Sequence, residues 1–79
     1  NPSLTIAHEQ LGTLNILSGR PAAGIAPLEY AIRLAPTDYR LFLKHGELGL
    51  AHLMLGNHAD ALAHAEAAIT LRPSYWHAH

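Results

Sequence analysis

Length, composition and charge narrow the class of protein before any motif is considered. The 79 residues suffice for one small folded unit, and 49% hydrophobic against 14% charged residues excludes a disordered tail. A formal net charge of -1 leaves no basic footprint for nucleic acid or an anionic membrane surface, and no apolar run is long enough to cross a membrane. The absence of cysteine excludes disulfides and thiolate sites.

The first predicted element is a helix that ends just before Gly19. Leu4, Leu11 and Leu14 recur at spacings of three and seven, which is typical of one buried helical face. Gly19 can adopt the left-handed conformation that ends a helix, and Pro21 fits the first turn of the next one. The sequence therefore predicts a tight turn between two helices.

The second predicted helix covers Ala22 to Leu34 and stops at Pro36. Because Pro27 lies inside it and removes a backbone hydrogen bond, we expect a kink or fraying there. Thr37 is a candidate cap for the helix that follows. One apolar stripe runs along this helix and consists of Ile25, Leu28 and Ile32.

The same pattern recurs 37 residues later. A shift of 37 aligns identical residues at twelve positions, most of them Gly, Pro, Ala or Leu. The third predicted helix carries Leu41, Leu48 and Met54, and Gly56 and Asn57 form the turn. The fourth covers Ala59 to Leu71 before Pro73. A repeat of this length predicts stacked helical hairpins.

The repeated unit resembles the tetratricopeptide repeat, on the motifs His8-x2-Leu11-Gly12 and His45-x2-Leu48-Gly49 with the later Ala31, Pro36, Ala68 and Pro73. The resemblance implies an all-α, α-α superhelix fold of two helix-turn-helix repeats plus the start of a fifth helix. The expected single module spans 1-79, with repeat 1 at 5-38, a spacer at 39-41, repeat 2 at 42-75 and the next helix starting at 74-79. The family's aromatic positions are replaced by His8, Asn15, His45 and His52.

The resemblance also implies a protein or peptide partner that binds along the concave face of the stack. The residues expected on that face are Ile6, Glu9, Thr13, Ile16, Leu17, Leu43, Gly46, Leu50, Leu53 and Met54. It lacks the Lys and Asn side chains that grip a peptide carboxylate in some family members. Alternatively, Leu50, Leu53 and Met54 pack against a following repeat. Exposed repeat ends also predict self-association, for example as a homodimer.

Neither catalysis nor a cofactor is expected, because the chain offers no nucleophile motif and no phosphate-binding glycine loop. A weak histidine-based metal site is a third possibility, although His45 and His52 are too far apart along one helix to share an ion easily. The pair His77 and His79 could chelate weakly. Seven histidines also allow a response to pH between about 5 and 7.

The first residues, Asn1-Pro2-Ser3, and the last, Trp76-His77-Ala78-His79, favour the interpretation that the chain is part of a larger protein. The amino-acid sequence is similar to repeat regions of bacterial adenylate-cyclase-like regulatory proteins. That resemblance implies, as the alternative function, a regulatory segment next to a catalytic domain. We expect a cytoplasmic location because no signal segment is recognisable.

Overall fold

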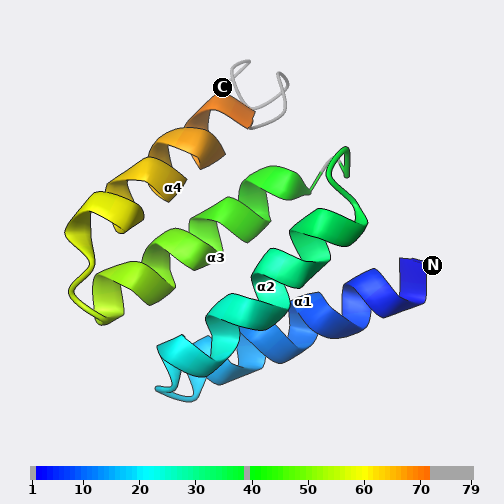
Figure 1. Cartoon of the computed structure of the whole chain (residues 1–79), viewed down its shortest axis with the longest axis horizontal. Helices are drawn as coiled ribbons and strands as arrows, with labels where there is room; N and C mark the ends of the chain where they lie inside the picture. Colours follow the sequence, from blue (N-terminus) through cyan, green and yellow to red (C-terminus); the bar gives the residue numbers. More distant parts are fainter. Residues whose placement is uncertain (1, 39, 72–79) are drawn as a thin grey trace, which may run out of the picture.

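A computed structural model describes residues 2–38 and 40–71 of the chain. Within this part the chain forms four helices and no strand. They are α1 (Pro2–Leu17), α2 (Pro21–Leu34), α3 (Leu41–Met54) and α4 (His58–Leu71), stacked so that α1 and α4 lie at opposite ends (Figure 1). The expected all-α fold of two helix-turn-helix units is confirmed. The expected fifth helix lies outside the described residues.

Both helical hairpins close with the same turn. Gly19 has a φ of 80° and Gly56 a φ of 82°, and both values lie in the left-handed region that favours glycine. The N–H of Arg20 donates to the Asn15 carbonyl at 2.8 Å, and the N–H of Asn57 donates to the His52 carbonyl at 2.8 Å. These two bonds are 37 residues apart, so the turns predicted from the two glycines are confirmed.

Small residues let the helices of each hairpin approach closely. A Cβ placed on Gly24 would lie 2.6 Å from the Gly12 carbonyl oxygen, closer than real Cβ contacts allow. The second hairpin has Gly49 and Ala61 at the corresponding positions. A Cβ on Gly49 would lie 3.3 Å from the Ala61 carbonyl oxygen, whereas a Cβ on Gly12 would lie 3.0 Å from that of Gly24. The first hairpin is therefore the more tightly packed of the two.

The hydrophobic core lies between the first hairpin and α3. Its buried members are Ile16, Leu28, Leu48 and Ala51, and Ile25 and Ile32 pack against them. Among the described helices, α4 packs against α3 alone, and none of its residues is buried. No helix in the described part is both long and apolar enough to cross a membrane.

Two local expectations differ from the structure. Thr37 does not cap α3: that helix begins at Leu41, and its N-cap residue is Arg40, whose side chain makes no capping hydrogen bond. Asp38 organises the connection instead, because its Oδ1 accepts the backbone N–H of Arg40 at 2.9 Å. α2 continues through Pro27 to Leu34, so the expected fraying there is wrong.

Candidate interaction surface

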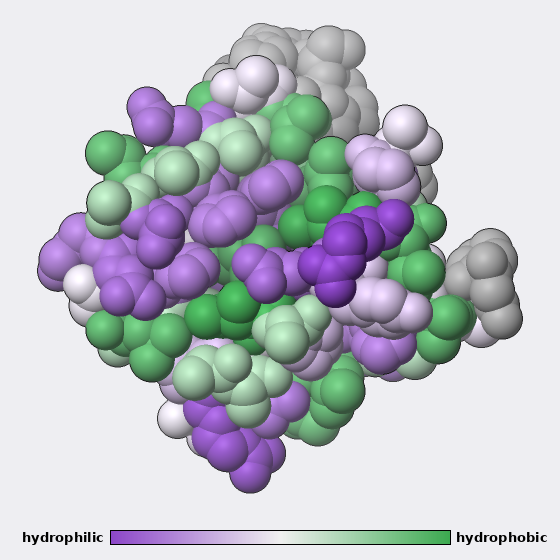
Figure 2. All heavy atoms as spheres, in the orientation of Figure 1, coloured by the Kyte–Doolittle hydropathy of each residue, from purple (hydrophilic) through white to green (hydrophobic). Residues whose placement is uncertain are grey.

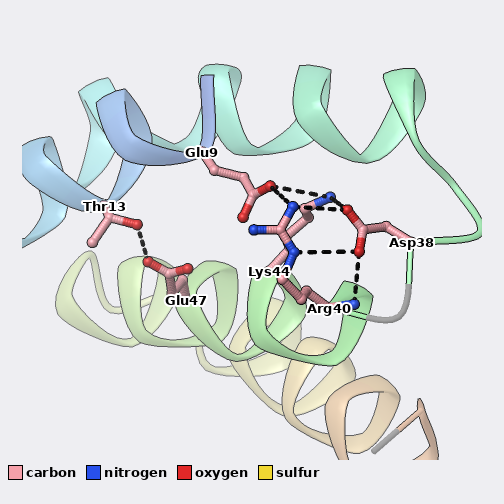
Figure 3. Close-up of polar contacts among 6 residues, drawn as sticks. All are labelled: Glu9, Thr13, Asp38, Arg40, Lys44 and Glu47. Carbon is pink, nitrogen blue, oxygen red and sulfur yellow. Dashed lines mark hydrogen bonds and ion pairs between the residues drawn. The ribbon is translucent and has the colours of Figure 1, made fainter. Parts of the chain in front are cut away.

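A charged cluster around the buried Lys44 holds α3 against α1. The Lys44 side chain is completely buried, and its Nζ lies 3.4 Å from Asp38 Oδ2 and 3.6 Å from Glu9 Oε2. Arg40 Nη2 lies 3.0 Å from the same oxygen of each carboxylate (Figure 3). A buried ammonium is tolerated only when it is paired, so these two carboxylates are what permit Lys44 at this position.

Asp38 contacts both cations of the cluster. Hydrogen bonds from the Arg40 side chain and backbone, together with the Lys44 charge, lower the pKa of Asp38 from 3.8 to about 2. The carboxylate therefore stays charged at every physiological pH. Asp38 belongs to the loop, Glu9 to α1 and Lys44 to α3, so the cluster joins three segments.

A second polar contact lies farther along the same two helices. The Thr13 hydroxyl of α1 donates a hydrogen bond to Oε1 of Glu47 on α3 (Figure 3). Together with the contacts of Glu9, this bond fixes the register between α1 and α3 at two points one helical turn apart. Side chains at equivalent positions on the two helices are thereby brought onto one surface.

We call this surface the α1–α3 stripe. On each helix it contains residues spaced by four, three and four, which share one helical face. Its apolar members are exposed, from 39% for Ile6 to 75% for Leu17. A shallow hollow of about 420 Å³ runs along its α1 side. The stripe consists of Ile6, Gln10, Thr13 and Leu17 of α1 and of Leu43, Glu47, Leu50 and Met54 of α3.

The structure separates the residues expected on the concave face into three groups. Ile16 belongs to the core with 3% exposure, so it is not available to a partner. Glu9 and Thr13 are engaged with α3 through the polar contacts described above. The remaining residues of the set are exposed and available, and they are Gly46 and the apolar Ile6, Leu17, Leu43, Leu50, Leu53 and Met54.

Gln10 and Glu47 belong to the stripe and were missing from the expected set. The set implied by the family resemblance has Glu9 in place of Gln10 on the first helix and Gly46 in place of Glu47 on the third. The spacing of Gln10 and Glu47 could have identified them, because each lies four residues after one stripe residue and three before the next. The charge cluster around Lys44 has no such signal, since its partners come from other segments.

A second apolar surface lies at the α4 end of the stack. This α3–α4 groove has a volume of about 530 Å³. Larger apolar side chains from both helices line it together with small residues, which leave room between them. Its lining includes Leu50 and Leu53 from α3 and Ala61, Leu62, Ala65 and Ile69 from α4.

Three histidines form a stack between α3 and α4. The His64 ring lies between those of His45 and His52, with centroid distances of 5.2 and 5.4 Å. The Nδ1 atoms of His45 and His64 are 2.9 Å apart, so one donates a hydrogen bond and the other accepts it. Hydrophilic side chains gather between the two helices on the face in Figure 2. Burial lowers the pKa of His45, and the neighbouring His64 lowers it further.

The histidine stack does not form a recognisable metal centre. Among the residues described, no group of three or more His, Asp or Glu side chains is placed to hold a metal ion. His52 instead lies near Asn57 and Asp60, at 3.3 and 4.0 Å. His8, His45 and His52 are half-buried, as expected of groups that pack rather than coordinate. His77 and His79 lie outside the described residues.

The fold is therefore that of an all-α helical-repeat protein. A comparison with family models gives a match to the tetratricopeptide repeat over residues 43–75, which confirms the second predicted copy as a repeat of this kind. The first hairpin is related to it by the internal identities at a distance of 37 residues. Tetratricopeptide repeats generally mediate protein–protein interaction and are not catalytic. Comparisons with curated proteins and with solved structures give no match.

Proposed function

We propose that this chain is a non-catalytic interaction module that binds an apolar segment of another protein along the α1–α3 stripe. The observation that carries the proposal is the row of exposed apolar side chains on α1 and α3. Polar contacts between these two helices fix their relative register. Leu17 and Leu43 are at least half exposed, although they lie beside buried contacts. Covering such side chains with a partner is favourable by about 25 cal/mol per Å² of apolar surface.

The polar groups of the stripe indicate the chemistry of the partner. The cations next to it, Arg40 and Lys44, already bind Glu9 and Asp38. They are therefore poorly placed to bind a carboxylate of the ligand. Glu47 adds a negative charge between apolar residues of α3. An apolar peptide with one Lys or Arg would complement this surface better than a peptide that ends in a free carboxylate there.

The test is a selection of binding peptides from a random library against the immobilised chain, followed by titration of the best binder. We expect apolar peptides with a basic residue. Leu43→Glu should weaken binding about tenfold or more, because it places a charge where an apolar contact forms. The matched control is Glu66→Gln, an exposed change on α4, which should leave the affinity unchanged. Equal binding by the Leu43 variant and the wild type would contradict the proposal.

The regulatory role next to a cyclase-like catalytic domain is not part of this proposal. Neither the repeat match at residues 43–75 nor the geometry of the described residues bears on that resemblance. The metal-binding alternative likewise gains no support from the geometry of the three stacked histidines. Partner binding is the function that the exposed stripe favours.

A further inference from the structure

The joint between the two hairpins is an interface that the chain makes with itself. α3 inserts one face against the first hairpin, so that Leu48 and Ala51 join Ile16 and Leu28 in a single buried cluster. Lys44 of the same α3 face is buried against Glu9. We call this arrangement the internal joint. It has two sides, an α3 face that inserts and a first-hairpin surface that receives it.

Both sides of this joint recur, without a partner in the described chain, at the opposite ends of the stack (Figure 1). The inserting side recurs on α1, 37 residues earlier, and we call this the α1 outer face. The receiving side recurs 37 residues later as the α3–α4 groove, where Leu53, Leu62 and Ile69 correspond to Ile16, Ile25 and Ile32. Leu62 is 62% exposed and Ile69 60%. The α1 outer face consists of Leu4, Ala7, Leu11 and Leu14.

The sizes of the side chains change together on the two sides. The internal joint contains Ala51 on the inserting side and Leu28 on the receiving side. At the equivalent positions the α1 outer face has Leu14 and the α3–α4 groove has Ala65. Compared with the internal joint, the α1 outer face thus has a larger side chain at this position, and the α3–α4 groove has a correspondingly smaller one. Such compensation conserves the packed volume, which is the condition for a core to tolerate substitution.

The charges change together as well. In the internal joint the buried Lys44 is paired with Glu9. The equivalent residues are Ala7 on the α1 outer face and Gly46 in the α3–α4 groove, so both the cation and its acid are missing. A lysine entering a groove without an acid would be buried unpaired, at a high energetic cost. The α1 outer face avoids that cost.

We propose that the α1 outer face of one copy of this chain docks into the α3–α4 groove of a second copy, as α3 docks onto the first hairpin. The two surfaces of each contact differ, so every complex still has one free α1 outer face at one end and one free α3–α4 groove at the other. Association of this type is head-to-tail, and it produces open chains unless the rotation between copies closes them into a ring. It goes beyond the proposed partner binding, and its test depends on Leu11 and Leu62, which do not belong to the α1–α3 stripe. The stripes of successive copies would form one longer surface.

The test measures assembly by sedimentation velocity over a wide range of protein concentration. Wild-type chain should form a concentration-dependent series of oligomers. Leu11→Glu removes the inserting side and Leu62→Glu the receiving side, and each should weaken association about tenfold or more. Both residues are exposed, at 49% and 62%, so circular dichroism should show that the variants remain folded.

An equimolar mixture of the two variants distinguishes this geometry from others. One intact α1 outer face and one intact α3–α4 groove remain in the mixture, so it should form a dimer and nothing larger. A closed dimer in which both copies pair the same surface behaves differently, since one of the two variants would still associate alone and mixing would add nothing. That result would overturn the proposal, as would a wild-type chain that stays monomeric at every concentration.

The size compensation provides a second, independent test. Leu14→Ala leaves a gap in the proposed contact and Ala65→Leu overfills it, so each alone should weaken association. The double variant reproduces the Ala51 and Leu28 pair of the internal joint and should restore most of the affinity. If the double variant associates as weakly as the single variants, or more weakly, then these two residues do not contact each other in the assembly.

Residues 72–79 are the other candidate occupant of the groove. If they cover it, the chain stays monomeric and the fluorescence of Trp76, the single tryptophan, shifts to the red in Leu62→Glu. This outcome would overturn head-to-tail assembly. It would leave the proposed partner binding intact, because the peptide titration depends on Leu43 and not on Leu62.

Discussion

Gly24 and Gly46 both lie inside helices, but their surroundings are opposite. The backbone of α1 leaves no space for a Cβ on Gly24, whereas a Cβ on Gly46 would have no neighbour within 4 Å. In an exposed helix interior glycine costs about 0.5–1 kcal/mol relative to alanine, because it loses more backbone freedom on folding. At Gly24 the clash with the Gly12 carbonyl outweighs that gain.

We therefore expect Gly24→Ala to lower the free energy of unfolding by about 1–3 kcal/mol, and Gly46→Ala to raise it by about 0.5–1 kcal/mol. Urea denaturation of both variants and the wild type measures the two values. The same substitution at two positions is its own control. A stabilised Gly24→Ala would mean that α1 and α2 do not cross at these glycines.

The burial of Lys44 could not be predicted from the sequence around it. In the sequence it is an ordinary polar position among the apolar residues of a helix, yet its side chain has no exposure at all. Its burial depends on Asp38 and Glu9, six and thirty-five residues earlier. Local patterns cannot reveal such a group, because the pairing exists only once three segments have met.

At the scale of the elements, α3 and α4 contact each other through ionisable side chains, including His45 and His64. Since burial and His64 lower the pKa of His45, the folded state favours the neutral ring more than the unfolded chain does. The contribution of His45 to stability is therefore present above its ordinary pKa of 6.5 and lost as the pH falls below that value. His52 and Asp60 face the same stack.

We expect the free energy of unfolding to fall as the pH is lowered from 7.5 to 5. His45→Gln, which can still hydrogen-bond to His64 but does not titrate, should flatten this profile. Thermal unfolding of both proteins across that pH range measures the difference. Identical profiles would show that protonation of His45 is not coupled to folding.

Most helix ends could be predicted from the residues at those positions. Gly19 and Gly56 end helices because they reach the left-handed region without a steric cost, and Pro21 begins one because its fixed φ suits the first turn. The start of α3 was less predictable. Thr37 and Asp38 can both bond to nearby backbone groups, and Asp38 is favoured because Arg40 and Lys44 also bind it.

Across the whole molecule, burial is distributed unevenly. Leu28 of α2 and Leu48 of α3 are fully buried, whereas α4 has no buried residue and touches α3 alone among the described helices. Stacked repeats unfold most easily where a unit has fewest neighbours. The α4 end should therefore open before the rest.

Hydrogen exchange measures this expectation. In dilute solution the amides of α4 should exchange fastest among the four helices, and those around Leu28 should exchange slowest. Protection of α4 should increase with protein concentration if a second copy covers its groove. Uniform protection in dilute solution would contradict the uneven stability.

The repeat of 37 residues determined the architecture, because helix starts, helix ends and close-packing positions depend on residues near one another in the chain. The tertiary structure decided which faces meet. It buried Lys44, placed Ile16 in the core rather than on the binding face, and inserted His64 between His45 and His52. Each of these depends on the rotation of one helix about its axis against another. That rotation is set by packing and charge pairing across distant segments, which no local pattern records.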